Sequence, residues 1–216
     1  MRVLVTAGPT YEPLDPVRFI GNHSTGKMGY ALAESFAAVG AEVTLISGPT
    51  NLPDPAHPRI QTQRVETADQ MYAAAAAAAP MADVWVFAAA VADYKPAHVA
   101  ENKIKKEGDT LTLELVKNVD IAATLGKTKR PEQFSVGFAL ETNNEEANAR
   151  EKLHRKNFNL VVLNSLRDAG AGFRVDTNKV TLLDAEGEML TFEVKLKAAV
   201  AHDIVQAVLA RLPREA

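Results

Sequence analysis

The feature that most constrains the fold is a regular alternation of short apolar runs with helical segments. Residues 2–7 (RVLVTA), 42–47 (EVTLIS) and 82–92 (ADVWVFAAAVA) are predominantly apolar, as buried parallel strands are. Residues 26–39 carry apolar side chains at helical spacing, and Thr67–Gln70 has the form of a capping box ahead of an alanine-rich helix. This alternation predicts an α/β fold: a doubly wound, mostly parallel, Rossmann-like sheet with helices on both faces.

The second half of the chain continues this alternation. A helix is expected near Asn118, a strand at 134–140, a helix from an Asn143 cap to Lys156, a strand at 158–164 and a final helix at about 197–212.

Two stretches depart from the pattern. Residues 109–116 (DTLTLELV) alternate apolar and polar side chains, which is typical of a half-exposed strand, and residues 178–195 predict a hairpin around Ala185–Gly187. We expect a single domain over 1–216 with these two stretches as additional β elements.

Composition excludes several classes of function. A net charge of −3 gives no sign of a nucleic-acid surface, and the absence of cysteine excludes disulfides, thiolate zinc sites and cysteine nucleophiles. No apolar run has the roughly 20 residues of a membrane span, and the first residues resemble a strand rather than a signal peptide. We therefore expect a cytoplasmic protein without nucleic-acid or membrane partners.

The segment from Gly21 to Lys27 has the spacing G-x-x-x-x-G-K of a phosphate loop. The next residue of such a loop is Ser or Thr, but here it is Met28, and about a dozen residues separate the segment from the first strand. The segment therefore predicts an anion-binding helix start without P-loop chemistry. A simple helix cap is the alternative, and the roles of Lys27 and His23 stay open.

A dinucleotide site is a weaker hypothesis for the same sheet. The chain has no G-x-G-x-x-G, and none of its four tyrosines is followed by lysine at the spacing Y-x-x-x-K. A reductase-like enzyme and a non-catalytic nucleotide-binding module therefore stay as alternatives to a phosphate-using enzyme.

Residues 87–106 form the second informative segment. Small residues at 88–90 and then Asp93 follow a buried strand, at the sheet edge where doubly wound proteins bind ligands. Lys103, Lys105 and Lys106 lie on a predicted loop, where they either neutralise a polyphosphate or form an ordinary solvated surface.

Together these segments resemble the phosphopantothenoylcysteine synthetase family, the synthetase half of the bacterial bifunctional coenzyme A biosynthesis protein. The matching motifs, in family order, are TAGPTYEPLDPVRFIGNHSTGKMG, AAAVADY, KIKK, KNVDI and GFALET. The resemblance implies a ligase that joins 4′-phosphopantothenate to L-cysteine, using CTP and Mg²⁺ and forming an acyl-cytidylate and pyrophosphate. It also implies a homodimer, with 109–116 and 178–195 as candidate interface strands, and a flavin-dependent decarboxylase half as fused or associated partner.

The resemblance also implies roles for individual residues. Asn22 and Lys103 are the expected catalytic residues: Asn22 orients the acyl-cytidylate, and Lys103 stabilises charge during transfer at phosphorus. The expected nucleotide-binding residues are Phe87, Ala88, Ala89, Asp93, Lys103, Val119, Asp120, Ile121, Ala122, Phe138, Lys152 and Lys156. The expected substrate-binding residues are Arg18, Asn22, Ser24, Gly26, Ala89 and Ala90, with Arg18 a candidate partner of the substrate phosphate.

The chain departs from the family at a few positions. Val119 replaces a common proline, Leu140 replaces an alanine, and the end of the chain lacks the usual Leu-Pro-Leu-x-x-Lys pattern. No decarboxylase half precedes Met1, so the sequence fits a free-standing synthetase or an excised domain. The preference for CTP over ATP and the metal ligands stay undetermined by the motifs.

Overall fold

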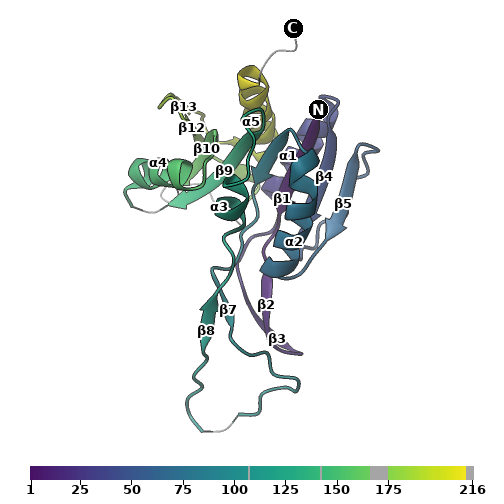
Figure 1. The fold of residues 1–216 in the computed structure, drawn as a ribbon, viewed down its shortest axis with the longest axis vertical. Helices are drawn as coiled ribbons and strands as arrows, with labels where there is room; N and C mark the ends of the chain where they lie inside the picture. The colour runs from purple at the N-terminus through teal and green to yellow at the C-terminus, as the bar shows by residue number, and fades with distance from the viewer. Residues whose placement is uncertain (107, 142, 166–174, 213–216) are drawn as a thin grey trace.

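A computed structural model describes residues 1–106, 108–141, 143–165 and 175–212, and its centre is an eight-stranded sheet (Figure 1). The strand order is β13-β12-β10-β9-β6-β1-β4-β5. The six strands from β10 to β5 run parallel, and β12 and β13 are antiparallel. Their bounds are β1 Arg2–Ala7, β4 Glu42–Ser47, β5 Ile60–Arg64, β6 Val84–Phe87, β9 Phe134–Glu141, β10 Leu160–Ser165, β12 Val180–Asp184 and β13 Met189–Thr191. The predicted doubly wound, mostly parallel sheet is confirmed.

Helices cover both faces of the sheet, as the alternation predicts. On one face α1 (Lys27–Ala38) and α5 (Lys197–Arg211) pack against the odd-numbered residues of β1, and α1 buries Phe36 completely. On the other face lie α2 (Ala68–Ala78), followed by the short 3₁₀ helix η1 (Ala79–Met81), α3 (Ile121–Gly126) and α4 (Glu145–Arg155). Burying a side chain such as Phe36 stabilises the fold by about 1.5–3 kcal/mol.

Two strand predictions are wrong in extent. The strand expected over 82–92 ends at Phe87, because the chain leaves the sheet there and Ala90 meets Pro9 in an isolated bridge. The strand expected over 109–116 is limited to β8 (Leu115–Lys117), which pairs with β7 (Tyr94–Pro96). Residues 109–114 have the alternating pattern of a strand but pair with no described strand.

Other boundaries differ less. The hairpin expected over 178–195 exists as β12 and β13. It is flanked by two short strands that pair with each other, β11 (Thr177–Asn178) and β14 (Lys195–Leu196). The helix expected from an Asn143 cap begins one residue later, with Asn144 at the N-cap.

Besides β7 and the short strands β11 and β14, three further strands were not predicted. The sequence of β5, IQTQR, is a polar edge strand without an apolar run. The hairpin of β2 (Tyr11–Asp15) and β3 (Arg18–Gly21) contains a proline, Pro13, that usually argues against a strand.

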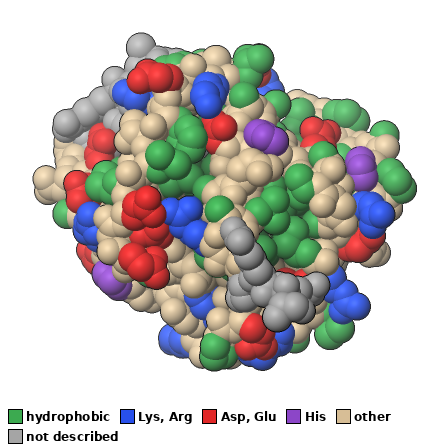
Figure 2. Space-filling model, turned by 90° about the horizontal axis from the view of Figure 1, so that it is seen from above, with side chains coloured by type: hydrophobic (Ala, Val, Ile, Leu, Met, Phe, Trp, Pro, Cys, Tyr) green, Lys and Arg blue, Asp and Glu red, His purple; other side chains and the backbone are tan. Residues whose placement is uncertain are grey.

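The β7–β8 pair and the long loop between its strands form an arm that projects from one end of the sheet, beside the β2–β3 hairpin (Figure 1). At the opposite end, acidic and basic side chains are interspersed with small apolar areas (Figure 2). No helix in the described ranges is both long enough and apolar enough to span a membrane.

Candidate active site

Two adjoining cavities lie at the carboxyl ends of β1, β6 and β9. The first has a volume of about 250 Å³ and the second of about 380 Å³. The order of the strands reverses between β1 and β6. From β1 the chain continues in this sheet to β4 on one side, whereas from β6 it continues to β9 on the opposite side. Doubly wound proteins bind ligands at such a point. The residues that line both cavities are Ala89, Ala90, Asp93, Phe138 and Lys152.

Small residues bring the backbone close together around the second cavity. A Cβ atom on Gly29 would lie 2.5 Å from the Cβ of Ala7, so only glycine lets the first turn of α1 pack so closely against β1. Gly26, the N-cap of α1, has φ +79°, a left-handed conformation that glycine adopts without strain. These two glycines therefore place the start of α1 directly at the cavity.

The second cavity contains the helix start predicted to bind an anion. Asn22 donates from Nδ2 to the carbonyl of Ala90, at 3.0 Å, and so connects the loop before α1 to the chain after β6. The Oγ of Ser24 accepts from the backbone N–H of Gly26 at 3.4 Å. The expected residues that line this cavity are Asn22, Ser24, Gly26, Ala88, Ala89, Ala90, Asp93, Phe138 and Lys152.

The first cavity has charged groups at one end. Asp120 caps α3 by accepting from the backbone N–H of Ala123, and its Oδ1 lies 2.9 Å from Nζ of Lys156. Burial raises the pKa of Asp120, but the hydrogen bond from Lys156 and other nearby donors outweigh it, so the pKa stays below its usual value. The expected nucleotide-binding residues on this wall are Phe87, Ala89, Asp93, Val119, Asp120, Ile121, Ala122, Phe138, Lys152 and Lys156.

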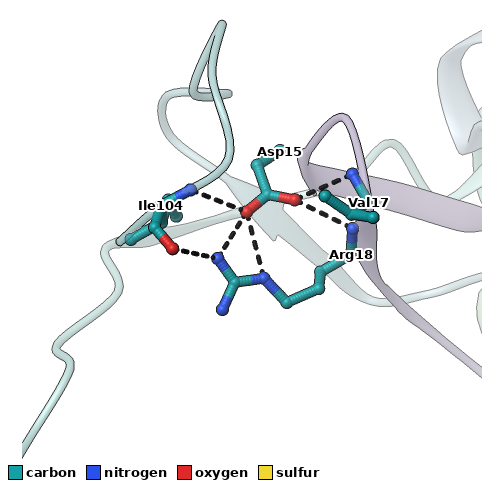
Figure 3. A network of polar contacts seen from close by, with 4 residues as sticks. All are labelled: Asp15, Val17, Arg18 and Ile104. Atoms are coloured by element: carbon teal, nitrogen blue, oxygen red, sulfur yellow. Dashed lines mark hydrogen bonds and ion pairs between the residues drawn. The ribbon is translucent and has the colours of Figure 1, made fainter. Parts of the chain in front are cut away.

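Arg18 and Lys103 lie apart from these two cavities. Both line a third cavity of about 840 Å³ at the outer loop of the arm, together with Lys105 and Lys106. Arg18 donates from Nε and Nη2 to the buried carboxylate of Asp15 (Figure 3). The guanidinium of Arg18 holds the pKa of Asp15 far below its usual range. Within one chain, the structure therefore brings together the expected residues except Arg18 and Lys103.

Sequence reasoning missed several residues of the second cavity. Lys197, the first residue of α5, is only 7% exposed and lines the cavity with Lys27, Asn164 and Asn178. Nζ of Lys27 forms an ion pair with Asp176 at 2.5 Å. No single motif brings these residues together, because the approach of β10, β11 and α5 depends on the whole sheet.

Two buried amide oxygens also point to a ligand. Among the described residues, Oδ1 of Asn118 and Oδ1 of Asn164 are buried without a hydrogen-bond partner. Asn118 lines the first cavity and Asn164 the second. Buried polar atoms are rarely left unsatisfied in native proteins, so these two acceptors are available to a bound molecule or water.

Comparison with known proteins gives consistent matches over almost the whole chain. The family model of the DNA/pantothenate metabolism flavoprotein C-terminal domain matches residues 1–212. The Coenzyme A biosynthesis bifunctional protein CoaBC of Vibrio cholerae is 47% identical over 93% of this chain and 51% of its own length. A protein named Cysteine/Cysteine sulfinic acid decarboxylase, from an unknown prokaryotic organism, is 48% identical over 96% of this chain and 58% of its own length. The chain thus spans only about half the length of these relatives.

A solved structure gives the same result for the fold. The crystal structure of the C-terminal domain of CoaBC aligns with a TM-score of 0.81 and 40% identity, over 96% of this chain and 93% of that one. The chain therefore belongs to the family of the DNA/pantothenate metabolism flavoprotein C-terminal domain, which confirms the family resemblance carried by its motifs.

Proposed function

We propose that this chain is a phosphopantothenate–cysteine ligase that uses CTP in coenzyme A biosynthesis. The observation that carries the proposal is the pair of adjoining cavities, which brings the α1 start and Asn22 next to the charged groups of Asp120, Lys152 and Lys156. The relatives named as CoaBC, the first with 47% identity, support the assignment of this site to the synthetase half of those proteins.

In the first step, a carboxylate oxygen of 4′-phosphopantothenate attacks the α-phosphorus of CTP and pyrophosphate leaves. The first cavity, with Asp120 capping α3 and the rings of Phe87 and Phe138 on its wall, holds the cytidine in this proposal. Lys152 donates to the carbonyl of Phe138 and lines both cavities, and in this proposal its ammonium group stabilises the phosphate charge between them.

In the second step, the amine of cysteine attacks the activated carbonyl carbon, an amide forms and CMP leaves with the former carboxylate oxygen. Asn22 orients the mixed anhydride in this proposal, because its hydrogen bond to the Ala90 carbonyl fixes the amide on the wall of the second cavity, beside residues 88–90. Holding the reacting groups in place accelerates such a step without any acid or base.

Mg²⁺ is compatible with the residues present. The described residues contain no group of three or more His, Asp or Glu placed to hold a metal ion. Mg²⁺ in nucleotide sites is usually bound by one or two carboxylates together with substrate phosphates, and Asp93 is an acidic residue that lines both cavities. Asp93 would hold the ion, which would neutralise phosphate charge.

The assembly is a further part of the proposal. Lys103 and Arg18 lie outside the two cavities of their own chain, so we propose that a second copy supplies them in a homodimer. The exposed apolar side chains of the arm, such as Leu111 and Leu113, support an interface there, and the 178–195 hairpin stays a second candidate. A decarboxylase half is a proposed partner, since the CoaBC relatives are about twice as long as this chain.

Pyrophosphate release tests the proposal. With CTP, Mg²⁺ and phosphopantothenate, we expect pyrophosphate to appear only when the acid is present, and the amide product only when cysteine is added. Substitution of ATP for CTP gives the nucleotide preference. Absence of acid-dependent pyrophosphate with either nucleotide would refute a ligase of this type.

A further inference from the structure

The buried carboxylate of Asp15 is the centre of a cluster that joins the β2–β3 hairpin to the loop of the arm between β7 and β8 (Figure 3). Its Oδ1 accepts from the backbone N–H groups of Val17 and Arg18, each at 2.9 Å. Its Oδ2 accepts from Nε and Nη2 of Arg18, at 3.0 and 2.5 Å, and from the N–H of Ile104 at 3.0 Å. Both oxygens are thus saturated with donors.

Ile104 is held through both of its peptide groups. Its N–H, which belongs to the peptide bond with Lys103, donates to Asp15, and its carbonyl, which belongs to the bond with Lys105, accepts from Nη2 of Arg18 at 2.9 Å. A further bond from the N–H of Ala100 to the carbonyl of Leu14, at 3.0 Å, ties the same segment to β2. The backbone on each side of Ile104 is therefore fixed to the hairpin.

The lysines beside Ile104 are exposed and available to an anion. Within the described ranges, no ion pair joins Lys103, Lys105 or Lys106 to a carboxylate, and Asp109 is the acidic residue on the wall of their cavity. Lysine side chains on a loop lose much conformational freedom when they bind a phosphate, so fixing the backbone beforehand reduces that cost.

We propose that Asp15 is a positioning residue: by holding Arg18 and both peptide groups of Ile104, it presents Lys103 to the phosphates of the nucleotide during the activation step. This inference rests on the proposed ligase function. Asp15 itself contacts no substrate, and it acts through Lys103.

Asp15→Asn is the variant that tests the inference. One carboxylate oxygen becomes an NH₂ group, which faces N–H donors whichever way the amide is turned, so at least two hydrogen bonds are lost. We expect acid-dependent pyrophosphate release to slow about tenfold, because only part of the cost of the lost hydrogen bonds falls on the activation step. Conversion of preformed acyl-cytidylate by cysteine should stay within about twofold of the wild type.

A double-mutant cycle separates positioning from a general structural defect. In a Lys103→Gln background, Asp15→Asn should add little further loss in activation, because the residue through which it acts is already absent. Equal effects of Asp15→Asn in the two backgrounds would overturn the inference. If the Asn variant does not fold, Arg18→Lys provides a second test with trypsin cleavage of the loop as its readout, since a lysine cannot bridge Asp15 and the Ile104 carbonyl as the planar guanidinium does.

Limited trypsin digestion gives a readout that does not depend on the reaction. We expect faster cleavage after Lys103, Lys105 and Lys106 in Asp15→Asn than in the wild type. Asp69→Asn is the matched control, because Asp69 pairs with Lys95 at another point of the arm but is 61% exposed. Unchanged cleavage in Asp15→Asn would overturn the inference, whereas a wild type that releases no pyrophosphate would refute the proposed function instead.

Discussion

The packing of Gly137 against Phe158 connects the core of the sheet to the first cavity. Gly137 lies in β9, and a Cβ atom there would be 2.0 Å from Cε2 and 2.4 Å from Cζ of the Phe158 ring. Phe158 is 5% exposed, and its ring lies 5.9 Å from that of Phe87, with both residues on the cavity wall. Gly137→Ala must therefore displace Phe158.

The expected cost follows from two opposing effects. Overpacking a core costs about 1–3 kcal/mol, and replacing glycine by alanine within a strand returns about 0.5–1 kcal/mol. We expect Gly137→Ala to lower the free energy of unfolding by about 1.5 kcal/mol, which for a chain of 216 residues lowers Tm by about 3–6 °C. The displaced ring also occupies part of the cavity, so CTP should bind more weakly.

Urea unfolding and a CTP titration measure these two effects. Phe158→Leu in the Gly137→Ala background should restore room for the new methyl group. The double variant should then be more stable than the sum of the two single changes predicts, by at least about 0.5 kcal/mol. Additive changes in stability, or a Gly137→Ala protein as stable as the wild type, would refute the reasoning.

Two further predictions concern the site and the opposite end of the sheet. Asn22→Asp should still form the acyl-cytidylate but convert it slowly with cysteine; single-turnover mass spectrometry checks this, and equal loss of both steps would contradict it. Burial lowers the pKa of Lys129, which donates to Ser135 and Asn159, to about 8. Between pH 8 and pH 10 the unfolded chain binds more protons at Lys129 than the folded protein does. The free energy of unfolding of the wild type, measured in urea, should therefore rise relative to that of Lys129→Met over this range. A constant difference would contradict this prediction.

The sequence predicted the sheet well where strands are buried on both faces. Such strands, for example β1 and β4, are continuous apolar runs, because both of their faces pack against helices. It failed for β5 and for the β2–β3 hairpin, whose residues are polar or include proline. In residues 109–114 the alternating pattern was present, but among the described residues only β7 pairs with this part of the chain, and it pairs with residues 115–117.

The site could be predicted in part for a related reason. Residues that follow buried strands, such as Asp93, must lie at the carboxyl edge of a parallel sheet, and the structure brings them to the two cavities. The position of Lys103 depends instead on hydrogen bonds between Asp15 and Ile104, which are 89 residues apart. Lys197 reaches the second cavity only because α5 packs beside α1. Neither contact has a local sequence signal.

An oxygen-isotope transfer experiment tests the central claim most directly. The proposed chemistry joins a carboxylate oxygen of the acid to the α-phosphorus and later breaks the bond between that oxygen and the carbonyl carbon. With phosphopantothenate labelled by ¹⁸O in its carboxylate, we predict that mass spectrometry finds one ¹⁸O in the released CMP and none in pyrophosphate. Unlabelled CMP, or label in inorganic phosphate, would contradict activation through an acyl-cytidylate.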